Sequence, residues 1–226
     1  MLAKAPVPGR VKTRLCPPCT LAEAAALGEA ALWDTLDAAG GAGADRLLVA
    51  LDGLPGDWLP PGAVVVDQGT GTLGQRLARA WSHVRHGALQ IGMDTPQVTS
   101  AVLADGLAAL ETPGTDAVLG LAEDGGWWAL GMTPSDPGAF TGVPMGRGDT
   151  GDSQRARLAT LGYRVALLPT LRDVDTAADA SAVAALVPHT RFAAAVRAQR
   201  LAPPPPDSPS TAPTLDPRST FHDHAR

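Results

Sequence analysis

The stretch Ala88-Leu-Gln-Ile-Gly-Met-Asp-Thr-Pro96 begins with an apolar run and ends with an acidic residue, a threonine and a proline. The apolar run predicts a buried strand over residues 88–92, and Thr99 is a typical N-cap for a following helix. A second apolar run at 117–121 predicts the next strand. This order of strand, helix and strand predicts a parallel pair joined by a helix, with Asp94 at the carboxyl end of the first strand.

The same alternation continues on both sides of this unit. Two capping boxes, Thr20-Leu-Ala-Glu23 and Thr72-Leu-Gly-Gln75, predict helix starts, because each threonine accepts an amide hydrogen bond and the third residue after it reaches back. Pattern and turn residues place strands over 47–51, 64–66, 127–130 and 163–168, and helices over 149–161 and 177–187. This alternation predicts an α/β fold, in which a mostly parallel sheet is covered by helices on both faces, in three layers.

Length, composition and net charge predict how the chain is organised and which classes of protein it does not fit. Its 226 residues, 45% of them hydrophobic, predict one domain over 1–200, followed by a disordered tail over 201–226 that is rich in Pro, Ser and Thr. A net charge of -5 argues against a general nucleic-acid binder, which needs a broad basic face. Neither an apolar run of about 20 residues nor a secretory signal is present, so we expect a cytoplasmic protein without a membrane span.

Both lysines of the chain, Lys4 and Lys12, lie in one N-terminal segment, Ala3-Lys-Ala-Pro-Val-Pro-Gly-Arg-Val-Lys-Thr-Arg-Leu15, although the chain has 18 basic residues. Because a compact ammonium differs chemically from a planar guanidinium and suits point contact with phosphate, this concentration indicates an anion-binding loop. Only Met1 and Leu2 precede the segment, so the strand before it is predicted to be very short.

The residues of this loop divide into three roles. Gly9 permits close approach of the backbone to a ligand. Arg10, Lys12 and Arg14 are suited to neutralise a diphosphate or triphosphate, and Lys12 is the stronger lysine candidate for phosphate contact. Lys4, at the end of the short strand, is a further nucleotide-binding candidate that supports the loop. The alternative is a solvated basic arm, which is the usual fate of a charge cluster.

One single aspartate and one pair of aspartates are candidates for metal binding. Asp94 at a strand end is placed to ligate magnesium, which takes one or two protein carboxylates and fills its other positions with phosphate and water. Asp173 and Asp175 share one side of an extended segment, and a metal would relieve their repulsion. Capping of the next helix by Asp175 or Thr176 is an open alternative for this pair, as helix capping is for Asp94.

The run Glu123-Asp-Gly-Gly126 follows another predicted strand. Asp124, Gly125 and Gly126 form a flexible acidic turn that could admit a nucleotide or a sugar. A β-hairpin turn explains the same residues equally well, because Asp-Gly is a strong turn signal between apolar stretches. No Walker A, Gly-x-Ser-x-Gly or Gly-x-Gly-x-x-Gly pattern is present, which argues against P-loop NTPases, serine hydrolases and dinucleotide oxidoreductases.

The segments quoted so far resemble a bacterial family of small GT-A-fold, glycosyltransferase-like proteins of unknown function. The resemblance rests on five segments: Ala3 to Leu15, Leu73-Gly-Gln-Arg76, Ile91-Gly-Met-Asp-Thr-Pro96, Ala122-Glu-Asp-Gly-Gly-Trp-Trp128 and Asp173-Val-Asp-Thr176. It implies the fold of nucleotide-diphosphosugar transferases, related to the guanylyltransferases of molybdopterin and 2-phospholactate. It also implies that Lys12 and its arginines hold nucleotide phosphates, that Asp94 binds magnesium, or manganese in its place, and that Asp173 and Asp175 complete the metal site.

These features lead to one principal hypothesis and two alternatives. The first is a metal-dependent glycosyltransferase-like enzyme, in which Lys12 and Asp94 are the catalytic residues acting on a nucleotide-sugar donor and a small-molecule acceptor. The second is nucleotidyl transfer, which releases pyrophosphate from a nucleoside triphosphate. The third is a non-catalytic nucleotide-binding protein. The sequence does not identify the base, the sugar or the acceptor. The segment Met145-Gly-Arg-Gly148 departs from the family pattern where an acceptor would bind.

Overall fold

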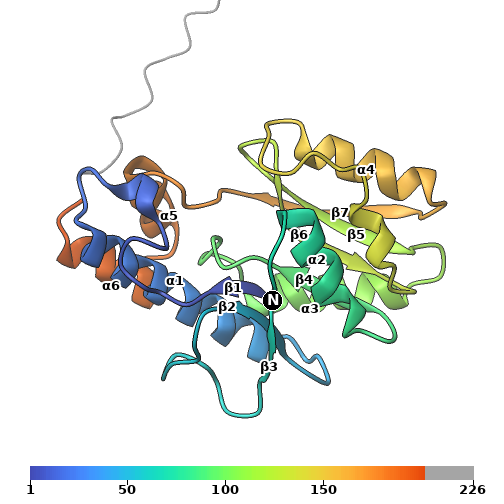
Figure 1. The fold of residues 1–226 in the computed structure, drawn as a ribbon, viewed down its shortest axis with the longest axis horizontal. Helices are drawn as coiled ribbons and strands as arrows, with labels where there is room; N and C mark the ends of the chain where they lie inside the picture. The colour runs from blue at the N-terminus through green and yellow to red at the C-terminus, as the bar shows by residue number, and fades with distance from the viewer. Residues whose placement is uncertain (202–226) are drawn as a thin grey trace, which may run out of the picture.

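Two β-sheets lie at the centre of the molecule, whose computed structural model describes residues 1–201 (Figure 1). The first sheet is entirely parallel, in the order β1-β2-β3. The second has the order β4-β6-β5-β7; β5 and β7 are parallel, and β6 runs antiparallel to both of its neighbours. The strands are β1 (Leu2–Lys4), β2 (Leu48–Asp52), β3 (Val64–Asp67), β4 (Ala88–Ile91), β5 (Ala117–Ala122), β6 (Trp127–Met132) and β7 (Val165–Leu171).

Helices cover both faces of the sheets, which confirms the predicted three-layer α/β fold (Figure 1). The helices are α1 (Leu21–Gly40), α2 (Leu73–Ser82), α3 (Ser100–Glu111), α4 (Thr150–Thr160), α5 (Ala177–Leu186) and α6 (Arg191–Ala198). Strand β5 shows how the layers form, because alternate residues of a strand point to opposite faces. Leu119 packs with α2 and α4 in one core cluster, whereas Val118 lies on the face covered by α3.

Both predicted capping boxes are present. Thr20 accepts a hydrogen bond from the amide of Glu23 at the start of α1, and Thr72 accepts one from the amide of Gln75 at the start of α2. A third capping box opens α5, where Thr176 is the N-cap. Asp175 is therefore not the cap of α5, and its carboxylate remains available for other contacts.

The two sheets meet where β1 and β4 end. The backbone amide of Lys4 donates a hydrogen bond to Met93 Sδ at 3.2 Å, just beyond β4. One core cluster also joins Ala3 and Val49 of the first sheet to Ile91 of the second. The carboxyl ends of β1 and β4 are consequently neighbours, as the parallel-sheet prediction requires for a shared site.

The tail predicted over 201–226 lies outside the described residues, except for Leu201, which packs against the cluster formed by α1, α5 and α6. Within residues 1–201, none of the helices combines the length and apolar character needed to cross a bilayer.

The two cysteines flank the bend that leads from the N-terminal segment into α1. Neither forms a disulfide, and Cys19 is buried in the cluster of α1, α5 and α6, where its thiol donates to Gln199 Oε1 at 3.6 Å. Burial, with smaller effects from Glu23 and Cys16, raises the pKa of the Cys19 thiol.

We therefore expect Cys19 to react slowly with thiol reagents. In the Cys16→Ser variant, where Cys19 is left alone, labelling at pH 7.5 should be at least about tenfold slower than in the Cys19→Ser variant, because the thiolate is the reactive species. Time courses with a chromogenic disulfide reagent measure both rates. Equal rates would show that Cys19 is as accessible as the half-buried Cys16.

Candidate functional site

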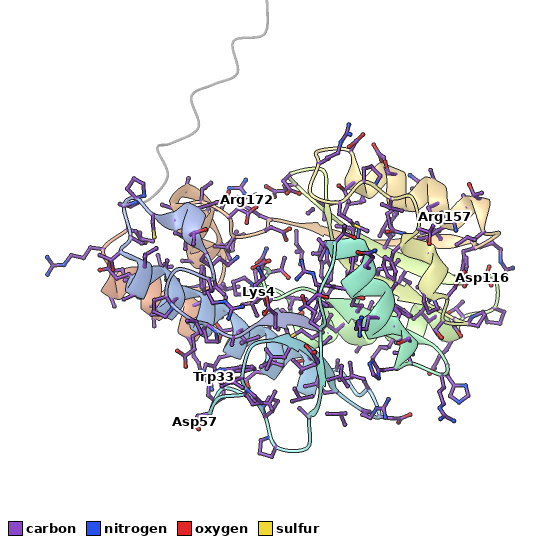
Figure 2. The ribbon with its side chains drawn as sticks, viewed as in Figure 1. Lys4, Trp33, Asp57, Asp116, Arg157 and Arg172 are labelled. Atoms are coloured by element: carbon purple, nitrogen blue, oxygen red, sulfur yellow. The ribbon has the colours of Figure 1, made fainter. Side chains whose placement is uncertain are left out.

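A cleft of about 440 Å³ opens at the carboxyl ends of β1 and β4. Its wall contains five basic residues and two acidic ones: Lys4, Arg10, Lys12, Arg14, Arg76, Asp94 and Asp175. Figure 2 shows Lys4, the last residue of β1, near the centre of the view. The wall therefore carries a surplus of positive charge, although the whole chain is acidic.

The basic segment after β1 is a shaped loop rather than a solvated arm. Val11 and Leu15 are buried, with exposed fractions of 5% and 0%. Gly9 has φ 79°, a conformation that glycine adopts without steric cost, and Lys12 has φ 51°. The absence of a side chain on Gly28 lets α1 approach, because a Cβ there would lie 3.3 Å from Val11. Packing on α1 thus fixes the loop that carries the basic residues.

Lys12 connects three segments that are far apart in the sequence. Its side chain is only 6% exposed, and its ammonium forms an ion pair with Asp94 and donates a hydrogen bond to the carbonyl oxygen of Val174. An ammonium has three N–H donors, so these two contacts leave one. Since Lys12 also lines the cleft, this third donor can serve a ligand oxygen.

The loops after β4 and β7 are tied to each other around Asp94. The amide of Val174 donates to the carbonyl oxygen of Asp94 at 2.9 Å, and the side-chain amide of Gln97 donates to the carbonyl oxygen of Arg172 at 2.6 Å. The buried hydroxyl of Thr95, next to Asp94, has no hydrogen-bond partner within the protein. The carboxylate of Asp94 is 45% exposed and faces the cleft, as predicted for a strand-end acid.

Asp173 lies in a crowded acidic environment. Burial, followed by the charges of Asp94, Asp124 and Asp175, raises the pKa of the Asp173 carboxyl to about 7, against the opposing charge of Lys12. The charges of Asp94 and Asp175, which line the cleft, therefore act on Asp173, which does not line it. Within residues 1–201, no three Asp, Glu, His or Cys side chains are close enough to hold a metal ion by themselves.

The two arginines of the loop form exposed ion pairs. Arg10 contacts Asp52 at 3.0 Å and Arg14 contacts Asp175 at 2.9 Å, with arginine side chains 60% and 75% exposed. Exposed pairs of this kind contribute about 0–1 kcal/mol, so a more highly charged ligand can displace them at little cost. Both arginines can therefore turn toward an anion in the cleft.

The acidic turn over 123–126 joins β5 to β6 as a hairpin. The side chain of Asp124 accepts a hydrogen bond from the amide of Gly126 at 2.8 Å, which stabilises the turn. Gly125 packs against the backbone of Gly148. None of the three lines the cleft, and Asp124 is linked to it only through its charge on Asp173. The hairpin interpretation is confirmed, whereas a nucleotide-binding role for these residues stays a prediction.

Two polar residues of the cleft, Gln68 and Arg76, were not among the predicted site residues. Gln68 follows β3 and is 1% exposed, and Arg76 lies in α2; the two are joined by a hydrogen bond. The only signal in the sequence was the Leu73-Gly-Gln-Arg76 motif. Gln68 had none, because its importance depends on strand pairing that local patterns do not reveal.

A second cavity of about 670 Å³ adjoins the cleft. It lies between the start of α2 and residues 140–146, and no charged side chain lines it. Leu73 lines both spaces. The two cavities thus offer neighbouring environments of different character, one basic and one uncharged.

Solved structures of known proteins are similar to the chain to different degrees. A crystal structure of a provisionally assigned nucleotide-diphospho-sugar transferase from Desulfovibrio desulfuricans is similar, with a TM-score of 0.77 and 24% identity over 88% of this chain and 93% of that one. The manganese complex of Rv0371c from Mycobacterium tuberculosis gives a TM-score of 0.48 and 23% identity, covering 80% and 95% of the two chains. 2-C-methyl-D-erythritol 4-phosphate cytidylyltransferase from Thermus thermophilus gives 0.42 and 21%, covering 62% and 78%.

The first of these similarities shows that the fold is that of the nucleotide-diphospho-sugar transferases. A comparison with curated protein sequences gave no match. Residues 20–147, more than half of the chain, match the family model described as uncharacterized protein conserved in bacteria (DUF2064). The chain therefore belongs to the bacterial DUF2064 family.

Proposed function

We propose that this protein is a metal-dependent transferase that binds the diphosphate of a nucleotide-sugar donor in the basic cleft. The observation that carries the proposal is the buried ammonium of Lys12, which is fixed by Asp94 and the carbonyl oxygen of Val174 and retains one donor. A fixed donor next to an acidic cluster supports stabilisation of charge on a departing diphosphate, since preorganised groups need no reorientation during the reaction. The similarity in fold to a provisionally assigned nucleotide-diphospho-sugar transferase supports the same reaction class.

The acidic cluster fits a divalent cation. Burial and, after it, repulsion from neighbouring carboxylates raise the pKa of Asp173 to about 7, and a cation of higher charge than Lys12 would relieve this repulsion. The buried hydroxyl of Thr95, the neighbour of Asp94 in the chain, is a further polar group without a partner at this strand end. Mg²⁺ or Mn²⁺ held by Asp94 with Asp173 or Asp175 would neutralise phosphate charge, and phosphate and water oxygens would fill its other positions.

Three basic residues of the loop contact different parts of the diphosphate. Lys12 holds a phosphate oxygen, while Arg10 and Arg14 leave their exposed carboxylate partners to contact the rest of the diphosphate. We place the acceptor in the uncharged cavity beyond Leu73, because that residue borders both spaces. This arrangement brings an uncharged acceptor group next to the phosphate end of the donor.

Nucleotidyl transfer is the alternative reaction, favoured by the surplus of basic residues in the cleft, which suits a triphosphate. Product analysis separates the two reactions. Release of a nucleoside diphosphate from nucleotide sugars supports glycosyl transfer, whereas release of pyrophosphate from nucleoside triphosphates supports nucleotidyl transfer. Nucleotide binding with neither product would support a non-catalytic binding protein.

Asp94→Asn tests the metal site. The change keeps the shape of the side chain but removes the charge that faces the cleft and pairs with Lys12. We expect metal-dependent affinity for a nucleoside diphosphate to fall at least about tenfold, because a carboxylate is a far better Mg²⁺ ligand than an amide. Titration calorimetry with and without magnesium measures this loss.

Asp105→Asn is the matched control, since Asp105 is exposed on α3 outside the cleft. The control should bind the magnesium nucleotide as the unaltered protein does. If Asp94→Asn also retained full metal-dependent affinity, Asp94 would not be a metal ligand and the proposed site would be wrong.

A further inference from the structure

Arg76 differs from the other arginines of the cleft in its pairing. Arg10 and Arg14 belong to the loop after β1, and each contacts a carboxylate. Arg76, in contrast, belongs to helix α2. Within the part of the chain that the structure describes, Arg76 forms no ion pair. Its positive charge is therefore not neutralised by the protein, although it borders the cleft.

Gln68 holds Arg76 in this position. The side-chain oxygen of Gln68 accepts a hydrogen bond from Arg76 Nη1. Its side-chain nitrogen donates to the carbonyl oxygens of Ala3 and Ala50, at 3.1 and 3.2 Å. These carbonyls belong to β1 and β2, so the guanidinium is fixed to the parallel sheet through a buried amide.

The guanidinium retains unused hydrogen-bonding capacity. It has five N–H donors, and Gln68 takes one through Nη1. The Nε atom is buried and has no hydrogen-bond partner within the protein. A buried unsatisfied donor on a cation is unfavourable, and a nearby anion reduces this cost through its charge. Because Nε is buried, direct contact with the anion falls to the three remaining Nη hydrogens.

We propose that Arg76 binds a phosphate oxygen of the ligand from α2, an element separate from the loop that carries Lys12, and that Gln68 is the positioning residue that aims it. The inference deepens the proposed function and rests on it. The phosphate chain then contacts cations from two separate elements of the cleft wall, the loop after β1 and helix α2. Because a planar fork can contact two oxygens at once, arginine suits this position better than lysine.

The test uses inorganic pyrophosphate and a nucleoside diphosphate as separate probes, each titrated into the full chain in the presence of magnesium. In the Arg76→Ala variant we expect the affinity for pyrophosphate to fall about 10- to 100-fold, the range for loss of charge-assisted hydrogen bonds. Arg76→Lys should recover only part of the loss, because an ammonium lacks the planar fork. Arg79→Ala, which removes an exposed arginine of the same helix outside the cleft, should bind as the unaltered protein does.

Gln68→Ala separates positioning from general damage to the fold. We expect about a 3- to 10-fold loss of pyrophosphate affinity in the otherwise unaltered chain, and no further loss when Arg76 is already alanine. A purely structural effect of Gln68 would lower affinity equally in both backgrounds. Thermal unfolding of each variant confirms that the protein titrated is folded, and Arg76→Lys provides the test if Arg76→Ala does not fold.

The outcomes separate this inference from the proposed function. If the unaltered protein binds both probes and Arg76→Ala and Arg76→Lys bind them equally well, the role of Arg76 is wrong while the cleft remains a nucleotide site. If the protein binds pyrophosphate through Arg76 but no nucleotide, the inference survives and the proposed function fails. If the unaltered protein binds neither probe, both are overturned.

Discussion

Lys12→Met is expected to lower the affinity for a magnesium nucleoside diphosphate by about 100-fold, which is about 3 kcal/mol. Methionine keeps the length and apolar character of the buried stem but removes the ammonium that contacts Asp94 and the carbonyl oxygen of Val174. The ligand then loses a charge-assisted hydrogen bond inside the cleft. Titration calorimetry with the folded variant measures the change.

The same substitution should not weaken the binding of a metal ion in the absence of nucleotide. Removing a positive charge from the cluster of Asp94 and Asp173 leaves their negative charge unopposed, so Mn²⁺ without nucleotide should bind at least as tightly as before. Lys4→Met removes the other lysine of the cleft, which is exposed, and should cause a smaller loss of nucleotide affinity. Equal losses for the two lysines would argue against a special role for Lys12.

Most of the fold follows from local patterns in the sequence. The helix starts at Thr20 and Thr72 were predicted because capping boxes use residues only three positions apart. The apolar runs likewise located the strands to within a few residues. The direction of β6 was not specified, because it depends on the turn at 123–126, where a hairpin and a ligand loop have the same residues.

The site was predictable only in part, for a related reason. Lys12 and Asp94 carry chemical signals of their own, a rare lysine and a strand-end acid, and the structure joins them in an ion pair. The hydrogen bond from Lys12 to Val174 spans 162 residues, and Gln68 reaches the carbonyl oxygen of Ala3 across 65. Such contacts depend on strand order and packing, and no pattern within one segment reveals them.

Gly125→Ala is expected to cause the largest loss of stability among single glycine changes near the site, about 3 kcal/mol. Gly125 has φ 87°, where a side chain costs about 1–2 kcal/mol. An added Cβ would also lie 1.9 Å from the carbonyl oxygen of Gly148, a backbone atom that can move only with its segment, and overpacking adds about 1–3 kcal/mol. Urea denaturation followed by circular dichroism measures the free energy of unfolding.

Gly162→Ala is the matched control for this clash. Gly162 has φ 86°, almost the same as Gly125, but no atom lies within 4 Å of a Cβ added there. Its replacement should therefore cost only the strain of the backbone conformation, about 1–2 kcal/mol, and the difference between the two variants measures the contact with Gly148. Equal losses would show that the turn and Gly148 separate readily. Because the amide of Gly151 also donates to the carbonyl oxygen of Gly125 at 2.8 Å, a separated turn would release the start of α4 as well.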